Sequence, residues 1–276
     1  MNIITTEITL GLESPVTLLH ISDTHLALAD ERDGERKVAL AAKRSPHFSR
    51  AESSLVEAAA LSKELGAPIV HTGDLIDFVS KLNLERAKRF MDENDVIFAA
   101  GNHEFSLYVG EAFEDAAYRN QSLDEVQKAF PEDIRFNSRI IGGVNLVGID
   151  NGYYLFEKEQ LDALKAEAAK GLPIILLMHN PLYEAKLYDL MINQRKSPCA
   201  YLVATPEELM TNYDEYRFRQ QKADAITLET VDYIKNEPLI KALLIGHLHF
   251  DYEGSVTETL TQYVTGIGTI RKIILK

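Results

Sequence analysis

Six short, strongly apolar runs, each ending in polar residues, constrain the fold of this chain more than any other feature. They span residues 16–22, 68–74, 96–103, 144–150, 173–180 and 241–249. Runs this apolar are typical of strands buried on both faces, rather than of strands with one face in water. Amphipathic segments at 53–65 and 84–91 predict helices between the runs. The alternation of strands and helices predicts an α/β architecture.

No internal repeat, proline-rich tract or glycine/serine linker divides the chain, so we expect one domain over residues 1–276. Two stretches, about 26–50 and 181–237, are longer than connections need to be. Both follow directly on polar run ends, so we expect them to form caps over a site there. The Thr-, Val- and Ile-rich tail from 251 to 276 predicts hairpin strands.

Composition and charge exclude several classes of protein. Hydrophobic residues make up 46% and charged residues 26%, as in ordinary globular domains. The formal net charge of −13 argues against duplex DNA or an anionic membrane as a partner. No apolar run is long enough to cross a membrane, and no secretory signal is visible. The single cysteine, Cys199, excludes an intramolecular disulfide, so we expect a cytoplasmic protein.

The polar residues that end the apolar runs are the candidates for a functional site. Ligands of open α/β sheets gather at the carboxyl ends of strands, so we expect these side chains to converge. Five of the eight histidines fall at such ends. In chain order the candidates are Asp23, His25, Asp74, Asn102, His103, Glu104, His179, His247 and His249.

These side chains suit transition metals. Imidazole with carboxylate and amide oxygen favours Mn, Fe or Zn, whereas calcium prefers oxygen ligands alone. Asp23-x-His25 and His247-x-His249 have period-two spacing, so on an extended backbone both members of each pair face the same way. No thiolate accompanies them, which excludes a cysteine-type zinc site. Seven candidate ligands suit two divalent or mixed-valence ions better than one.

The ordered set D-x-H, G-D, G-N-H-E, H and G-H-x-H resembles the motifs of the calcineurin-like metallophosphoesterases. The match runs from Asp23 to His249 with all five motifs intact. Each motif alone is weak, whereas five in order are specific. The resemblance implies a hydrolase of phosphoric esters. It also implies a four-layer αββα sandwich of two mixed β-sheets flanked by helices, with the site at one edge of the sheets.

The resemblance also implies a role for each candidate. One metal would be held by Asp23, His25 and His249, the second by Asn102, His179 and His247, and Asp74 would bridge the two. His103 would lie beside the phosphate as a proton donor or, with Asn102, as an electrostatic stabiliser. A hydroxide between the metals would attack phosphorus in line.

Two further acidic residues have two interpretations each. Asp77 either orients a histidine ligand or makes a local turn or cap. Glu104 either orients a ligand or caps a helix start.

More ordinary explanations suffice for the other polar candidates. His20 and His71 lie inside apolar runs, where we expect structural hydrogen bonds, and we expect His47 at the surface. We favour solvated surface charge over substrate contact for Arg195, Lys196, Arg217 and Arg219. We favour packing over stacking on a base for Tyr183, Tyr188, Tyr201, Tyr213 and Tyr216.

Two branches of the superfamily do not fit. The segment from Gly73 to Phe78 lacks the Arg-Gly of protein Ser/Thr phosphatases, and Asp77 stands where purple acid phosphatases place a tyrosine ligand. The cyclic-nucleotide phosphodiesterase branch stays open. We expect a small phosphodiester as substrate, with a phosphomonoester as the alternative, because no arginine is visibly placed to neutralise a dianionic ester. A metal-dependent nuclease, disfavoured by the net charge, and a non-catalytic scaffold are the other functions considered.

Overall fold

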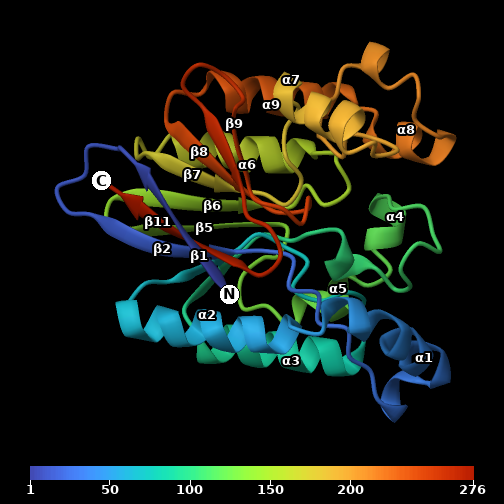
Figure 1. The fold of residues 1–276 in the computed structure, drawn as a ribbon. Coiled ribbons are helices and arrows are strands. Elements are labelled where there is room, and N and C mark those ends of the chain that lie inside the picture. Colours follow the sequence, from blue (N-terminus) through green and yellow to red (C-terminus); the bar gives the residue numbers. More distant parts are fainter.

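Two β-sheets lie face to face in the computed structural model, which describes all 276 residues (Figure 1). Parallel and antiparallel pairs occur in both sheets, so both are mixed. The five-stranded sheet has the order β1 (Asn2–Ile8), β11 (Thr269–Leu275), β2 (Val16–Ile21), β3 (Ile69–His71), β4 (Val96–Phe98). The six-stranded sheet has the order β5 (Phe136–Ile141), β6 (Val144–Ile149), β7 (Ile174–Leu177), β8 (Ile240–Ile245), β10 (Thr261–Val264), β9 (Tyr252–Ser255).

Helices cover the outer face of each sheet. The five-stranded sheet is covered by α2 (Ala51–Leu65) and α3 (Lys81–Glu93), and the six-stranded sheet by α6 (Lys158–Ala168) and α9 (Ala225–Asn236). The shorter helices are α1 (Glu35–Arg44), α4 (Ala116–Arg119), α5 (Leu123–Gln127), α7 (Ala185–Asp189) and α8 (Glu215–Gln221). The predicted four-layer αββα sandwich is thus confirmed.

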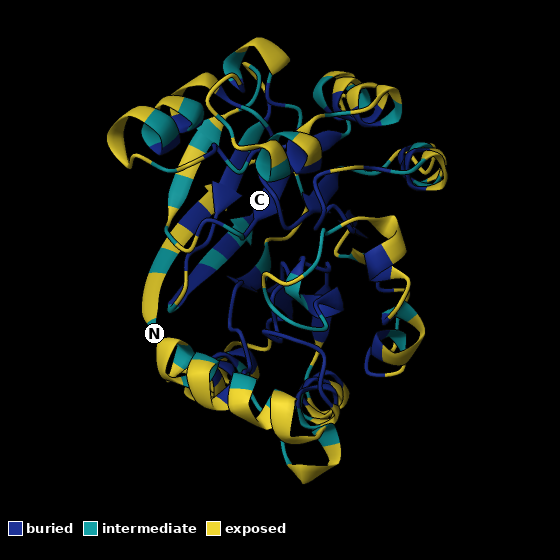
Figure 2. Cartoon of the chain, turned by 90° about the vertical axis from the view of Figure 1, so that its right-hand side faces the viewer, coloured by how far each residue is buried: buried dark blue, intermediate teal, exposed yellow.

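The apolar runs are continuous because each strand buries both faces. In β2, Leu18 faces the other sheet while Leu19 faces the helical layer, and in β7 Leu177 and Leu176 divide in the same way. Figure 2 shows the result, with buried strands in the interior and exposed outer faces on the helices. Each leucine buried in this way contributes about 1.5–3 kcal/mol relative to an exposed one.

Strand direction decides where the site lies. β2, β3 and β4 are parallel to one another, and so are β6, β7 and β8. Their carboxyl ends therefore reach the same edge of each sheet, and the loops that follow meet there. His20 joins the two sheets beneath these loops: its Nε2 lies 2.8 Å from Thr72 Oγ1 and its Nδ1 2.8 Å from Thr265 Oγ1.

The structure corrects the sequence-based outline in three places. Strands β1 and β5 were not predicted, and both lie at sheet edges where the hydrophobic pattern is weak. In the tail, β9 and β10 form the expected hairpin, but β11 crosses to the other sheet and lies between β1 and β2. The stretch 181–237 was expected to form a cap, but its helix α9 belongs to the helical layer. Val231 and Ile234 of α9 pack in the hydrophobic core against the six-stranded sheet's outer face.

None of the helices is both long enough and apolar enough to cross a membrane.

Candidate metal centre

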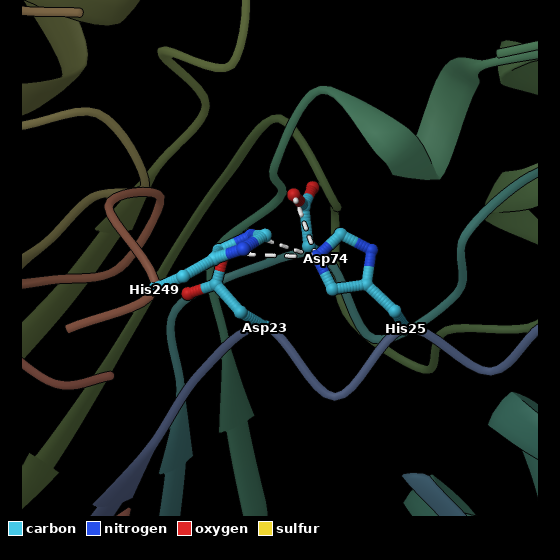
Figure 3. A group of neighbouring side chains, drawn as sticks. All are labelled: Asp23, His25, Asp74 and His249. Atoms are coloured by element: carbon cyan, nitrogen blue, oxygen red, sulfur yellow. Dashed lines mark hydrogen bonds and ion pairs between the residues drawn. The ribbon is translucent and has the colours of Figure 1, made fainter. Parts of the chain in front are cut away.

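Four side chains from three separated loops point at one another beyond the ends of β2, β3 and β8 (Figure 3). Asp23, His25, Asp74 and His249 each offer one ligand atom, and these atoms lie within 4.8 Å of one another. His25 Nε2 is 3.1 Å from His249 Nε2 and 3.6 Å from Asp74 Oδ2, and His249 Nε2 is 3.4 Å from Asp23 Oδ1. Carboxylate oxygens and imidazole nitrogens that face a common point are the donor set of a transition-metal site.

A second group of ligand atoms adjoins the first. Asp74, His179 and His247 also offer atoms within 4.8 Å of one another, so Asp74 belongs to both groups. Its Oδ2 lies 3.2 Å from His179 Nε2, which lies 3.2 Å from His247 Nδ1. Asn102 Oδ1 is buried beside them without a hydrogen-bond partner. A buried acceptor without a partner is costly, and a cation would satisfy it.

Hydrogen bonds on the far side of three of the four imidazole rings fix which nitrogen faces the centre. His179 Nδ1 lies 2.7 Å from the Thr72 carbonyl oxygen, which can only accept, so Nδ1 carries the proton and Nε2 presents its lone pair. His25 Nδ1 lies 3.1 Å from Asp77 Oδ1 and is held in the same way. His247 Nε2 lies 2.7 Å from the Tyr154 hydroxyl, which leaves Nδ1 facing His179.

The loops hold these side chains at a conformational cost. The four residues of the first group and His247 have a positive φ, between 52° and 69°: Asp23, His25, Asp74, His247 and His249. Left-handed backbone at residues other than glycine is uncommon and collects at functional sites. Glycines permit the close approach of the loops, because a Cβ on Gly73 would lie 2.7 Å from His179 Nδ1. The unusual backbone conformation of these loops therefore brings the side chains to their positions around the centre.

Glu104 holds two of the loops together. Its buried carboxylate accepts hydrogen bonds from the backbone N–H groups of Asp74 (2.8 Å), Leu75 (2.7 Å) and Gly101 (2.7 Å). Burial and the Asp74 carboxylate raise the pKa of Glu104 to about 7. The contact is with the backbone of the Asp74 loop and not with a ligand side chain, and it is not the N-cap of a helix.

Asp77 reaches both His25 and an arginine that the sequence analysis missed. The guanidinium of Arg44, on α1, donates from Nε and Nη2 to the two carboxylate oxygens of Asp77 at 2.7 Å each. Phe48 stacks on a face of the His25 ring, with centroids 4.2 Å apart. The stretch 26–50 therefore holds His25 directly through Phe48 and indirectly through the Arg44–Asp77 pair.

The charges of the centre depend on one another. Burial opposes ionisation of Asp74, but the imidazoles of His179 and His103 hold the pKa of this carboxyl well below its usual range. Burial likewise opposes a charge on His179, yet Asp74 and Asp23 raise the pKa of the imidazole to about 10. A divalent cation would replace that proton as the partner of the two carboxylates.

A cleft of about 610 Å³ opens over this centre. His103 lies on its wall, with Nδ1 2.6 Å from the Asp77 carbonyl oxygen, so the protonated Nδ1 leaves Nε2 for the cleft. The other lining residues are Asp74, Asn102, Val109, Gly110, Glu114, Tyr154, Met191, Tyr201, Asp214, Tyr216, Arg217, His247, Leu248 and His249.

Residues 16–251 of the chain match the family model of the calcineurin-like phosphoesterases. The chain belongs to the calcineurin-like phosphoesterase family. Its five motifs, and the side chains that they place around the centre, all lie within the matched region. A comparison with the curated proteins finds no match.

Solved structures resemble this calcineurin-like phosphoesterase distantly. A dimetal phosphatase from Danio rerio is 14% identical, with 91% of this chain and 87% of that chain covered and a TM-score of 0.48. The phosphopantetheinyl hydrolase of Mycobacterium tuberculosis is 14% identical, with 91% and 89% covered and a TM-score of 0.46. A putative 5'-nucleotidase from Staphylococcus aureus is 13% identical, with 92% and 49% covered and a TM-score of 0.43. These values carry no substrate over to this chain.

The structure places the other polar candidates as follows. His71 is buried with Nε2 3.1 Å from Thr24 Oγ1, and His47 is exposed. The prediction that Arg217 is a solvated surface charge is wrong, because it is half-buried and lines the cleft. Tyr201 and Tyr216 line it as well, whereas Arg195 packs on Phe250.

Three cleft or loop residues had escaped the sequence analysis: Arg44, Glu114 and Tyr154. None of them lies in a run end or a motif of the calcineurin-like phosphoesterases. Only the length of the stretch 26–50, directly after Asp23-Thr-His25, hinted at Arg44. Tyr154 has a φ of +66°, but the sequence does not show backbone strain.

Proposed function

We propose that this protein is a two-metal hydrolase of small phosphate esters. One observation carries the proposal: two groups of ligand atoms share the Asp74 carboxylate at the floor of a cleft that also holds His103. One ion would lie among Asp23, His25, Asp74 and His249, and the other among Asp74, Asn102, His179 and His247. The nitrogen and oxygen donors suit Mn, Fe or Zn.

Ions bound there would supply an acidified water and positive charge for the phosphoryl oxygens. The chain's own residues would do the rest. Asp74 would fix the spacing of the two sites, and the hydrogen bonds from the far side of His25 and His179 would fix their rings. Burial opposes a charge on His103, but Asp74 and Asp77 raise the pKa of its imidazole. The imidazolium form carries a proton on Nε2 as well as on Nδ1, and it would donate that proton to the leaving oxygen or stabilise charge on the phosphate.

The cleft supports a small substrate. Its volume of about 610 Å³ lies in the range of small-molecule sites. The net charge of −13 disfavours nucleic acid, which is bound through many Lys and Arg contacts to phosphates. A diester was preferred because no arginine was expected near the substrate. Arg217 lines the cleft, so monoesters and diesters are both candidates.

Hydrolysis of p-nitrophenyl phosphate and of bis(p-nitrophenyl) phosphate by the metal-stripped protein, with and without Mn²⁺, tests the proposal. We expect turnover of at least one ester that requires the added metal and disappears again with a chelator. Metal binding without turnover of either ester would contradict a hydrolase of simple esters and favour the scaffold. Stimulation by DNA with a steep salt dependence would indicate a nuclease.

A further inference from the structure

Arg217 has an unusual place in the cleft. It is the one lysine or arginine among the lining residues, whereas Asp74, Glu114 and Asp214 bring carboxylates to the same space. It lies on α8, within the stretch 181–237 (Figure 1), and lines the cleft. A cation placed among carboxylates usually pairs with one of them. Arg217 does not, because no carboxylate oxygen lies within 4.0 Å of its guanidinium nitrogens.

Neighbouring side chains hold the guanidinium in position without neutralising it. Its Cζ lies 5.2 Å from the ring centroid of Tyr201 and 5.2 Å from that of Tyr216. Its Nη1 donates to Gln220 Oε1 at 2.8 Å, and Gln220 Nε2 in turn donates to Glu114 at 2.7 Å. Gln220 thus bridges Arg217 and Glu114, and Asp214 Oδ1 accepts the backbone N–H of Arg217 at 2.7 Å. Neither carboxylate pairs directly with the guanidinium.

The guanidinium therefore keeps most of its hydrogen-bonding capacity. Arginine has five N–H donors in a planar fork, and Arg217 uses one of them within the chain. The remaining donors are not sealed in the protein, since no atom of Arg217 is among the buried polar atoms without a partner. A half-buried, held and unpaired arginine fork matches the two oxygens of a carboxylate or phosphate.

The place of Arg217 relative to the centre indicates which part of a substrate it meets. The Tyr201 ring that it contacts packs on the His247 ring, with centroids 5.7 Å apart. One side chain thus separates Arg217 from a candidate ligand. The guanidinium lies over the ring faces of both tyrosines, so a nucleic-acid base that stacked on these faces would have to compete with it.

We propose that Arg217, held by Tyr201, Tyr216 and Gln220, is a subsite for a second anionic group, a carboxylate or a phosphate, on the leaving-group side of the substrate. This inference rests on the proposed function, because it takes the scissile phosphate to lie at the metal centre. It narrows the substrate class to small phosphate esters with at least one further negative charge.

Two pairs of esters that differ in one anionic group test the subsite. Phosphoserine carries a carboxylate that phosphoethanolamine lacks, and ribose bisphosphate carries a phosphate that ribose phosphate lacks. With the Mn²⁺-loaded protein, we expect kcat/KM to be at least about tenfold higher for the more anionic member of at least one pair, as one charged hydrogen-bonded contact would give. The pair that responds distinguishes a carboxylate from a phosphate.

The matched variants are Arg217→Gln and Arg219→Gln. Both remove one charge from α8, but Arg219 packs over Phe113, with its Cζ 4.6 Å from the ring centroid, and does not line the cleft. We expect Arg217→Gln to bring the kcat/KM ratio of the responding pair close to one, mainly through KM, and Arg219→Gln to leave that ratio unchanged. Equal ratios in the wild type and Arg217→Gln, or an equal loss in both variants, would overturn the subsite.

Failure of the proposed function has a different signature. If the p-nitrophenyl esters are not hydrolysed either, the hydrolase is refuted, and calorimetry with phosphoserine and ribose bisphosphate then decides the subsite by itself. Binding to the wild type that is about tenfold weaker in Arg217→Gln supports it. No binding of either probe, or equal binding to both proteins, overturns it. Turnover of the p-nitrophenyl esters without a preference inside either pair refutes only the subsite.

Discussion

Arg44 binds both oxygens of the Asp77 carboxylate, and Asp77 in turn holds His25 through its Nδ1. Asp77 is fully buried, whereas Arg44 is partly exposed at 24%. Helix α1 thus acts on the metal centre without contacting it. Carboxylate partners of metal-binding histidines orient the ring and increase its basicity. Arg44 fixes the position of the Asp77 carboxylate, and it thereby helps to orient the His25 ring that this carboxylate contacts.

Replacement of Arg44 by Gln tests this relationship. We expect the variant to remain folded, because Arg44 lies at the surface, but to lose about tenfold in Mn²⁺ affinity or in kcat. Arg44→Lys should recover part of the loss, since lysine restores the charge but not the two-fold contact. Equilibrium dialysis and kinetics measure both quantities. Wild-type affinity and kcat in Arg44→Gln would mean that the pair is only structural.

Replacement of Asp74 by Asn tests the shared ligand. Because Asp74 belongs to both groups of ligand atoms, we expect the variant to bind less of both ions and to lose turnover by at least about a hundredfold. Asp92→Asn is the matched control, since Asp92 pairs only with Lys88 on the exposed face of α3. Metal analysis beside kinetics gives the answer. Loss of one ion with wild-type turnover would refute the bridging role.

Replacement of His103 should lower the rate of hydrolysis but leave metal binding unchanged. We expect His103→Ala to keep its bound ions and to lose about 10²–10⁴ in kcat, most for esters with poor leaving groups, which need a proton. A series of phenyl esters of increasing leaving-group pKa measures the dependence. An equal loss across the series would argue for charge stabilisation instead of proton donation.

Glu104 should contribute to the free energy of unfolding. Its carboxylate accepts three short backbone hydrogen bonds, and Glu104→Gln replaces one acceptor oxygen by a donor. We expect the free energy of unfolding to fall by about 1–3 kcal/mol, because a buried backbone N–H loses its partner. Urea unfolding in the presence of a chelator measures this without a contribution from metal. Unchanged stability would show that the loops hold their shape without Glu104.

Acid should destabilise the fold through its buried neutral histidines. Burial lowers the pKa of His71 to about 3, and burial together with Arg271 lowers the pKa of His20 as well. Such a group binds its proton more readily when unfolded, so stability is lost as the pH falls below about 6.5, by up to about 1.4 kcal/mol per pH unit for each group. For His71 the loss continues down to about pH 3.

His71→Gln isolates this effect. Urea unfolding of the chelator-treated wild type and variant between about pH 7 and about pH 5 should show a shallower loss of stability in the variant. Parallel curves for the two proteins would mean that His71 is not kept neutral by the fold.

The sequence predicted those parts of the fold and centre that depend on local pattern. The apolar runs predicted the central strands because they are buried on both faces, and the residues that end them reach one edge because the strands are parallel. Edge strands β1 and β5 were missed, because half-exposed residues carry little hydrophobic signal.

Long-range contacts explain what else the sequence did not show. Arg44 and Asp77 are separated by 33 residues, and Tyr154 and His247 by 93. Arg217 was taken for surface charge because nothing in its neighbourhood along the chain predicts that α8 turns it into the cleft. Such pairs depend on how the layers pack, which neither hydrophobic periodicity nor motif spacing records.

Turnover should depend on the amount of bound metal, because the proposed reaction needs both ions. Metal-stripped protein would be titrated with Mn²⁺ while bound metal and hydrolysis of bis(p-nitrophenyl) phosphate and p-nitrophenyl phosphate are followed together. We expect two ions to bind per chain and turnover to reach its maximum only when the second ion is bound. Full turnover with one ion, or with none, would contradict this expectation.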